Sequence, residues 1–148
     1  MIEKIEKFKL VPNLEAKSHI IDLKLSSVLF EDNKYYPWIF LVPRKPDVKN
    51  MLNLTMDERM QLMKEIAICE NVMNSLFPND QINVAMIGNM TPQLHVHIIC
   101  RKKEDPDWPN TVWNNAKIPY ETHEKHDTII KIRNAIIEHT IGTDDIHH

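Results

Sequence analysis

Two histidines stand two residues apart inside the apolar run "TPQLHVHIIC", residues 91–100. Side chains alternate across a β-strand with a period of two, so a strand here places Gln93, His95 and His97 on one face. The opposite face is apolar and is expected to pack on the core: Leu94, Val96 and Ile98. A rigid strand that presents two imidazoles on one face is well suited to hold a reactive group.

Three interpretations of this histidine pair are open. The strand can face solvent and carry its histidines incidentally. The pair can bind zinc, but zinc needs a third ligand, Cys100 has the opposite parity, and the chain has no C-x-x-C motif. The third interpretation is nucleophilic catalysis by an imidazole, which is largely neutral near pH 7 because its ordinary pKa is about 6.5.

The segment "GNMTP", residues 88–92, precedes the histidines and predicts a loop. It carries Gly88, Asn89 and Thr91. We expect its backbone amides and its Asn and Thr side chains to approach an anionic ligand.

Four strands are expected to position these residues. Segment 18–32 is rich in β-formers and should contain a strand that ends near Glu31, followed by a turn at 33–37. The apolar run 38–45, stopped by Pro43, should pair with it as a hairpin. The remaining strands are predicted at 82–89 and 94–102.

Two helices complete the expected elements. Residues 53–77 form the clearest one, with Thr55 and Glu58 matching a capping box. Its apolar stripe should face the sheet: Leu62, Ile66, Cys69 and Val72 or Met73. The second is predicted at 126–140, with Asp127 or Thr128 near its start, after a loop at 105–119. This order predicts an α+β domain: an antiparallel sheet with a long central helix and a C-terminal helix.

Composition limits the class of protein. A length of 148 residues predicts one domain spanning 1–148, and a formal net charge of −3 gives no reason to expect a nucleic-acid polymer as partner. No apolar stretch approaches about 18 residues, so no membrane span is expected. The start "MIEKIEKFKL" lacks the apolar region of a signal peptide, and two cysteines make no disulfide framework. We therefore expect a cytoplasmic protein.

The segment "QLHVHIICRK", residues 93–102, resembles the motif of the histidine-triad (HIT) family, His-φ-His-φ-His-φ-φ, where φ is apolar. Gln93 takes the first histidine position, His95 the second and His97 the third. The resemblance extends over about residues 28–113, through "VLFEDNKYYPWIFLVPRKP" (28–46) and "LNLTMDERMQLMKEI" (52–66). The tail "DPDWPNTVW" (105–113) is similar to that of a bacterial branch of the family.

The resemblance implies a nucleotide hydrolase or transferase that acts at the α-phosphorus of dinucleoside polyphosphates or nucleoside phosphoramidates. His95 matches the family nucleophile and would form a nucleotidyl-histidine. His97, Asn89 and the loop amides are the candidate donors to the phosphoryl oxygens, as oxyanion stabilisation requires. Asp32 matches the ribose-hydroxyl acceptor, although an Asp here is also typical of a turn. The resemblance implies no metal or other cofactor, and it implies a homodimer.

Gln93 departs from the family pattern. An amide donates hydrogen bonds but does not titrate, so Gln93 cannot protonate a leaving group. We therefore expect polyphosphates, which are good leaving groups, to be preferred over amines. A non-catalytic nucleotide-binding module and a small zinc protein remain as alternatives.

Several further residues have two interpretations each. The aromatic residues Phe30, Tyr35 and Trp38 can line a base pocket or belong to the core. Trp108 and Trp113 can close over the site, contact a second subunit or anchor their loop. Arg101 and Lys102 can contact phosphate, but a basic pair at a strand end is usually solvated. The remaining histidines look incidental: His123, His126, His139 and the terminal pair.

Overall fold

A computed structural model describes residues 7–147 and contains one five-stranded antiparallel sheet. The strands are β1 (Ser18–Asp22), β2 (Ser26–Phe30), β3 (Trp38–Pro43), β4 (Gln81–Ala85) and β5 (Val96–Arg101). Their order across the sheet is β1-β2-β3-β5-β4, so β5, which carries the histidine motif, is an inner strand. The N-terminal residues 1–6 and His148, to which some of the expectations above refer, lie outside the described part.

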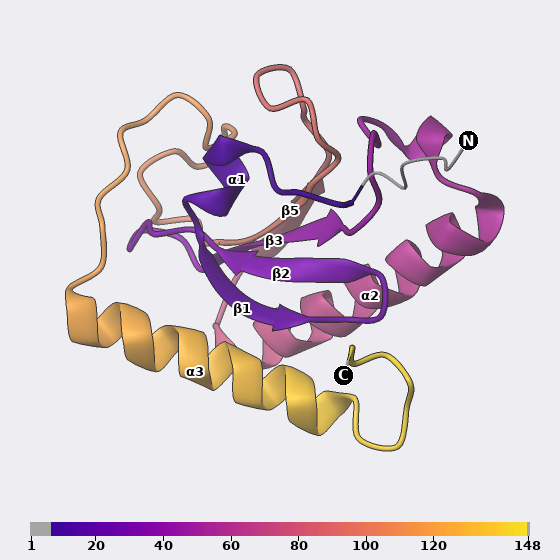
Figure 1. Ribbon diagram of the computed structural model, residues 1–148. Coiled ribbons are helices and arrows are strands. Elements are labelled where there is room, and N and C mark those ends of the chain that lie inside the picture. The colour runs from indigo at the N-terminus through magenta and orange to yellow at the C-terminus, as the bar shows by residue number, and fades with distance from the viewer. Residues whose placement is uncertain (1–6, 148) are drawn as a thin grey trace, which may run out of the picture.

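The helices are α1 (Pro12–Glu15), α2 (Met56–Leu76) and α3 (Thr122–His139), with a 3₁₀ turn at Met51–Asn53. Helices α2 and α3 pack against each other and against one face of the sheet (Figure 1). The α+β class, the antiparallel sheet and both long helices are as predicted. In residues 7–147 no helix has the length and apolarity needed to cross a membrane.

The two faces of the sheet pack against different parts of the chain, because side chains alternate between the faces along each strand. One face forms the main core with α2 and α3, and β5 contributes Val96, Ile98 and Cys100 to it. Leu94 belongs to the same core, as its parity predicts. The other face packs beneath α1 and the loop after β5, through a second apolar cluster: Leu14, Leu29, Tyr36, Trp38, Phe40, Val42, Ile99 and Val112. The histidines lie on this second face.

Local signals predicted the start of α2 correctly. The Oγ1 of Thr55 accepts from the N–H of Glu58, and the Glu58 carboxylate accepts from the N–H of Thr55. This capping box satisfies two amides at the helix start. The predicted apolar stripe is buried, and the helix ends at Leu76, just before Phe77 and Pro78.

Several boundaries differ from the predictions. Segment 18–32 contains two strands, because the chain reverses at 23–25 and β1 pairs with β2. Strand β4 ends at Ala85, four residues early, and its continuation to Gly88 is exposed. Helix α3 begins at Thr122 rather than near Asp127, because its first turn is exposed and gives no apolar signal. Helix α1 is too short for a periodic pattern and was not predicted.

Candidate active site

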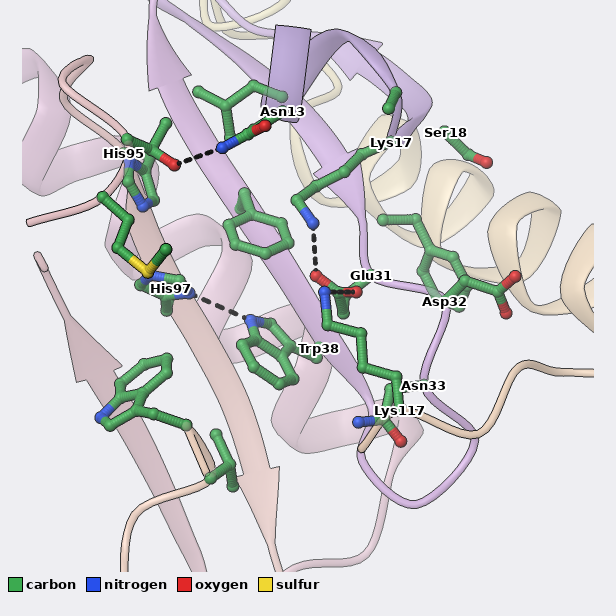
Figure 2. Close-up of a pocket in the computed structure, with 18 of the residues that line it drawn as sticks. Asn13, Lys17, Ser18, Glu31, Asp32, Asn33, Trp38, His95, His97 and Lys117 are labelled. Atoms are coloured by element: carbon green, nitrogen blue, oxygen red, sulfur yellow. Dashed lines mark hydrogen bonds and ion pairs between the residues drawn. The ribbon is translucent and has the colours of Figure 1, made fainter. Parts of the chain in front are cut away.

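The two motif histidines face a cavity of about 650 Å³ on the second face of the sheet (Figure 2). His97 lies on β5 opposite Phe40 of β3, and His95 immediately precedes the strand. Their ring centres are 4.8 Å apart, and both residues are buried, with 5% and 6% of their surface exposed. The cavity therefore brings two nearly dry imidazoles to one wall, as the alternation of β5 predicts.

The tautomer of His95 is set by a backbone carbonyl. Its Nδ1 lies 2.7 Å from the carbonyl oxygen of Gln93. A carbonyl oxygen can only accept, so Nδ1 carries the proton and donates. In neutral His95 the lone pair then resides on Nε2, which has no hydrogen-bond partner in residues 7–147. This arrangement leaves Nε2 available as a nucleophile.

His97 is held in the opposite tautomer. The indole Nε1–H of Trp38 donates to Nδ1 of His97 at 3.2 Å, so Nδ1 accepts and the proton of the neutral ring is on Nε2. Burial, aided by the nearby His95, Lys17 and Lys117, lowers the pKa of His97 to about 3. His97 is therefore neutral near pH 7, with an N–H to donate.

Aromatic rings enclose the histidines. The ring centres of Phe40 and Trp113 lie 4.8 Å and 4.7 Å from that of His97. Trp113 thus covers the site from the loop after β5, which is one of the arrangements considered from sequence. Of the three aromatic candidates for a base pocket, Trp38 and Phe30 line the cavity, although both are buried in the apolar clusters. Tyr35 is exposed and does not line this cavity.

The side chain of Gln93 is bound to the N-terminal segment rather than facing the cavity. Its Oε1 accepts from the N–H of Val11, and its Nε2 donates to the carbonyl of Lys9. The expected continuation of strand parity to Gln93 is wrong, because β5 begins at Val96 and the N–H of Gln93 turns back to Thr91. Gln93 therefore contacts His95 through its own carbonyl, and not through its amide group.

The other predicted binding residues are only partly brought together. Asp32 and Thr91 line the cavity with the histidines, whereas Asn89 is exposed and does not. The Oδ1 of Asp32 accepts from the N–H of Tyr120, and its Oδ2 lies 3.5 Å from the Nζ of Lys125. The hydroxyl of Thr91 accepts from Asn13 of α1.

The cavity also contains a cluster of charged side chains that no sequence pattern predicted. Glu31, of which 3% is exposed, forms ion pairs with Lys17 at 2.6 Å and with Lys117 at 2.7 Å. Lys17 follows α1, Glu31 follows β2, and Lys117 precedes α3. These residues are far apart in the sequence and no motif joins them, so sequence patterns alone gave no signal.

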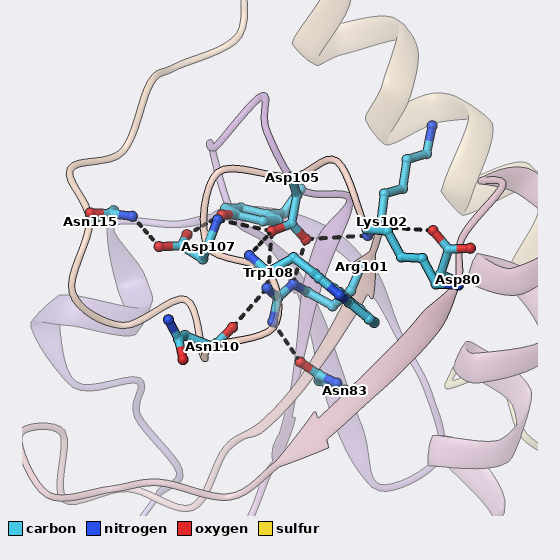
Figure 3. A network of polar contacts seen from close by, with 11 residues as sticks. Asp80, Asn83, Arg101, Lys102, Asp105, Asp107, Trp108, Asn110 and Asn115 are labelled. Atoms are coloured by element: carbon cyan, nitrogen blue, oxygen red, sulfur yellow. Dashed lines mark hydrogen bonds and ion pairs between the residues drawn. The ribbon is translucent and has the colours of Figure 1, made fainter.

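Arg101 is buried, contrary to the expectation that the basic pair at the end of β5 is solvated. Its guanidinium donates to both carboxylate oxygens of Asp105, to Asn83 and to the carbonyl of Asn110 (Figure 3). The expectation holds only for Lys102, which is exposed. The cause is the loop after β5, whose Asp105 turns back over the strand end.

The loop that carries Trp113 is fixed by the same polar network. Asp105 also accepts from the N–H groups of Asp107 and Trp108. The Cζ atom of the Arg101 guanidinium lies 5.8 Å from the centre of the Trp108 ring. Asp107 accepts from the Tyr36 hydroxyl and from Asn115. Trp108 is therefore an anchor of the loop, whereas Trp113 is the residue that reaches the site.

The histidines of α3 do not line the cavity. His123, His126 and His139 are exposed on α3. Within residues 7–147, no group of three or more His, Cys, Asp or Glu side chains is arranged to hold a metal ion. The zinc interpretation thus lacks the third protein ligand that such sites use.

Comparison with known proteins gives a consistent result. A family model described as HIT domain matches residues 13–104. A histidine triad protein from Bradyrhizobium japonicum is 36% identical, with a TM-score of 0.85 over 88% of this chain and 99% of that chain. One from Marinobacter aquaeolei is 31% identical, with a TM-score of 0.86 over 90% and 98%. No curated protein sequence matches.

A more distant structure shares the fold. It is that of the diadenosine triphosphate hydrolase of Plasmodium falciparum, determined in complex with cyclomarin A. The identity is 19% and the TM-score 0.66, over 92% of this chain and 88% of that chain. This likeness concerns the architecture alone.

Proposed function

Because this chain belongs to the histidine-triad family, we propose that it is a nucleotide hydrolase or nucleotidyltransferase that acts through a nucleotidyl-histidine. The family model and the relatives support nucleotide binding or hydrolysis in general terms. The observation that carries the finer proposal is the fixed tautomer of His95, whose Nδ1–H is bound to the Gln93 carbonyl. Such a partner orients a ring and leaves Nε2 as the basic atom.

In the proposed reaction, Nε2 of His95 attacks the α-phosphorus of the nucleotide. A P–N bond forms, and the bond between phosphorus and the leaving group breaks, with its electron pair going to the leaving group. Water then attacks the same phosphorus, the P–N bond breaks, and the mononucleotide is released with His95 restored. Two easier steps replace one difficult displacement, which is the advantage of a covalent intermediate.

His97 and Thr91 are the proposed donors to the phosphoryl oxygens. His97 is suited because its low pKa keeps it neutral with its proton on Nε2. A positioned donor in a dry site stabilises developing charge more strongly than water does. Asn89 is kept as a candidate donor, although its side chain has to move to reach the cavity.

Asp32 is the proposed acceptor for the ribose hydroxyls. It lines the cavity that contains His95, and a carboxylate accepts several hydrogen bonds. The cavity volume of about 650 Å³ is within the range of small-molecule sites. A nucleotide with its ribose at Asp32 and its phosphorus at His95 would extend along this cavity.

The Gln93 position determines which leaving groups are proposed. Its amide cannot titrate and is bound to the backbone of Lys9 and Val11. General acid assistance contributes about 10²–10⁴-fold where a proton donor is present. We therefore propose that dinucleoside polyphosphates are turned over faster than phosphoramidates, whose amine leaves only after protonation.

A turnover panel tests the proposal. Diadenosine tetraphosphate and adenosine phosphoramidate are incubated with the protein, and the products are separated by chromatography. The quenched protein should carry an acid-labile mononucleotide. Binding of nucleotides without turnover or trapped adduct would favour a non-catalytic binding module. Activity lost on chelation and restored by zinc would favour the zinc protein, and native mass spectrometry would show the bound metal.

We also propose a homodimer. Strand β4 is an edge of the sheet, and apolar side chains at or after it are exposed: Val84, Met86 and Ile87. The C-terminal segment covers the end of the other edge strand, β1, where the N–H of His147 donates to the Asp22 carbonyl and the next residue, Leu23, forms a bridge with Ile146. An uncovered apolar edge strand is a typical pairing surface. Native mass spectrometry or light scattering measures the subunit count.

The proposed location is the cytoplasm. Cys69 and Cys100 are free and buried in the core, a form compatible with a reducing compartment. The formal net charge of −3 gives no electrostatic reason to propose a nucleic-acid polymer as a ligand.

A further inference from the structure

The cluster of Lys17, Glu31 and Lys117 has no part in the reaction as described above. Each oxygen of the Glu31 carboxylate holds one ammonium: Oε2 binds Lys17 and Oε1 binds Lys117. The lysine side chains are 17% and 52% exposed, whereas that of Glu31 is 5% exposed. A buried carboxylate thus fixes two cations at the cavity wall, with their remaining N–H groups directed away from it.

The cluster lies close to the reacting histidines. The Lys17 ammonium is 4.6 Å from the ring centre of Phe40. That ring centre is in turn 4.8 Å from His97 and 6.1 Å from His95, measured to their ring centres. Figure 2 shows the Lys17–Glu31 pair in the middle of the cavity view, between the histidines and Asp32. A ligand that spans the distance from Asp32 to His95 therefore passes the two ammonium groups.

The charges of the cavity do not cancel. Its lining has three lysines and two carboxylates, which leaves one net positive charge in a chain whose formal net charge is −3. Lys125 faces Asp32, so the surplus belongs to the cluster at Glu31. An ammonium has three donors, and the only hydrogen bond of Lys17 within the described residues is to Glu31. A phosphoryl oxygen can be added without breaking the existing pair.

The donors expected from the motif do not fully compensate the charge of a phosphoryl group. The amide of Gln93 is bound to backbone, and Asn89 does not line the cavity. His97 alone offers one N–H from the motif strand. A phosphoryl group beside two buried imidazoles needs more donors than this one, because a buried charge without partners is costly. Of the three lysines in the lining, Lys125 faces Asp32, so Lys17 and Lys117 are the cations left for a phosphoryl group.

We infer that Lys17 and Lys117, fixed by the Glu31 carboxylate, bind the phosphate oxygens of the nucleotide at His95 and set the preference of this site for phosphorylated nucleosides. The inference deepens the proposed function, on which it depends for the identity of the ligand as a nucleotide.

Binding of AMP and adenosine, measured by isothermal titration calorimetry, tests this inference without requiring turnover. The wild type should bind AMP more tightly than adenosine, since only AMP carries a phosphate. Hydrogen bonds to charged groups contribute enough that K17M and K117M should each lower AMP affinity by about tenfold or more. Adenosine affinity should fall far less, so the ratio of the two affinities decreases.

Two further variants make the measurement specific. K24M removes a lysine of the same 52% side-chain exposure that pairs with Asp144 outside the cavity, and it should leave the affinity ratio unchanged. K17R keeps the charge and should retain most of the AMP preference. Lys117 is half exposed, so K117M is expected to fold even if K17M does not.

The outcomes separate this inference from the proposed function. A wild type that binds AMP no better than adenosine overturns the inference, as do lysine variants that lose both ligands equally. Lysine-dependent AMP binding without any turnover supports the inference and refutes the hydrolase. Turnover with a trapped adduct, but with an affinity ratio insensitive to both lysines, supports the hydrolase and refutes the inference.

Discussion

The two ends of strand β5 carry buried polar side chains that differ in how completely the protein satisfies their hydrogen-bonding groups. Arg101, at the end of the strand, is 2% exposed, and its guanidinium donates to Asp105, Asn83 and Asn110. His95 and His97, at its start, are almost as buried, but each has only its Nδ1 bonded within the described residues. Both histidines line the cavity, and their Nε2 atoms have no hydrogen-bond partner within residues 7–147.

The difference indicates which cluster is structural and which is reactive. A fully paired buried charge contributes to a single packed arrangement, and removing one partner is strongly destabilising. A buried imidazole with one fixed and one free nitrogen is held in orientation but can still react. Residue type and burial alone do not distinguish the two cases. The pairing of each polar atom does.

The two clusters are also connected. The Arg101 network fixes the loop from Asp105 to Asn115 (Figure 3). The same loop places Trp113 against His97. Figure 2 shows the other side of the arrangement, where Trp38 contacts His97 from β3. We therefore expect the Arg101 network to affect activity only by positioning Trp113, whereas His95 and His97 affect it directly.

The largest effect is predicted for H95A. Removal of the nucleophile should lower kcat by about 10⁴–10⁶-fold, the range seen when a catalytic nucleophile is lost. The free energy of unfolding should fall by only about 1 kcal/mol, because a single hydrogen bond to the Gln93 carbonyl is removed.

Steady-state turnover, trapping of the nucleotide adduct and urea unfolding measure these effects. H123A, which changes an exposed histidine of α3, is the control and should behave as wild type. Turnover by H95A close to the wild-type rate would refute the proposed mechanism.

The opposite pattern is predicted for R101M. Loss of the guanidinium leaves the Asp105 carboxylate buried without its charged partner, so the free energy of unfolding should fall by about 3–5 kcal/mol. Activity of the folded fraction should decrease much less than in H95A. K102M, at the exposed neighbouring position, should change stability by about 0.5 kcal/mol at most. Equal stabilities of R101M and K102M would show that the network does not support the loop.

The features predicted correctly from sequence are those encoded locally. The parity of β5 placed His95 and His97 on one face, and the Thr55–Glu58 capping box marked the start of α2. Both depend on residues within a few positions of each other. The early start of α3 was missed because its first turn is exposed and carries no apolar pattern.

The features missed depend on contacts between distant segments. Strand parity placed Gln93 beside the histidines, but a turn to Thr91 and bonds to Lys9 and Val11 move its side chain away. Arg101 appeared solvated because the folding back of Asp105 cannot be read from a strand end. Lys17 and Glu31 meet only once the chain from α1 lies over the sheet.

The pH dependence of stability should distinguish the buried histidine from exposed ones. The pKa of His97 is about 3 in the folded protein and close to the ordinary 6.5 when unfolded. Between these values the unfolded chain binds more protons, so the free energy of unfolding decreases as the pH falls below 6.5. One proton corresponds to at most about 1.4 kcal/mol per pH unit, and to a few kcal/mol over the window.

Urea unfolding of wild type and H97N between pH 4 and pH 7 measures this contribution, because carboxylates contribute to both proteins and cancel in the difference. H97N should show a shallower loss of stability on acidification, whereas H123N should retain the wild-type slope. Parallel curves for wild type and H97N would mean that His97 titrates normally, which would remove the argument for a neutral donor at this position.

The smallest effect is predicted for Q93H. This substitution turns a side chain that is fully hydrogen-bonded to the backbone into a titratable group that can reach the histidines. The Gln93 side chain now satisfies the backbone of Lys9 and Val11, and an imidazole cannot replace both bonds. Stability should therefore fall by about 1–3 kcal/mol. A histidine released from this role can reach the site and protonate a leaving group, and kcat/KM for adenosine phosphoramidate should rise by about 10²-fold at most, the low end of general acid assistance. For diadenosine tetraphosphate the gain should be smaller, because its leaving group departs without a proton.

Q93A, which loses the same backbone bonds but gains no titratable group, is the control. Equal changes in kcat/KM for the two substrates in Q93H would show that position 93 has no part in proton delivery and that the proposed polyphosphate preference needs another cause.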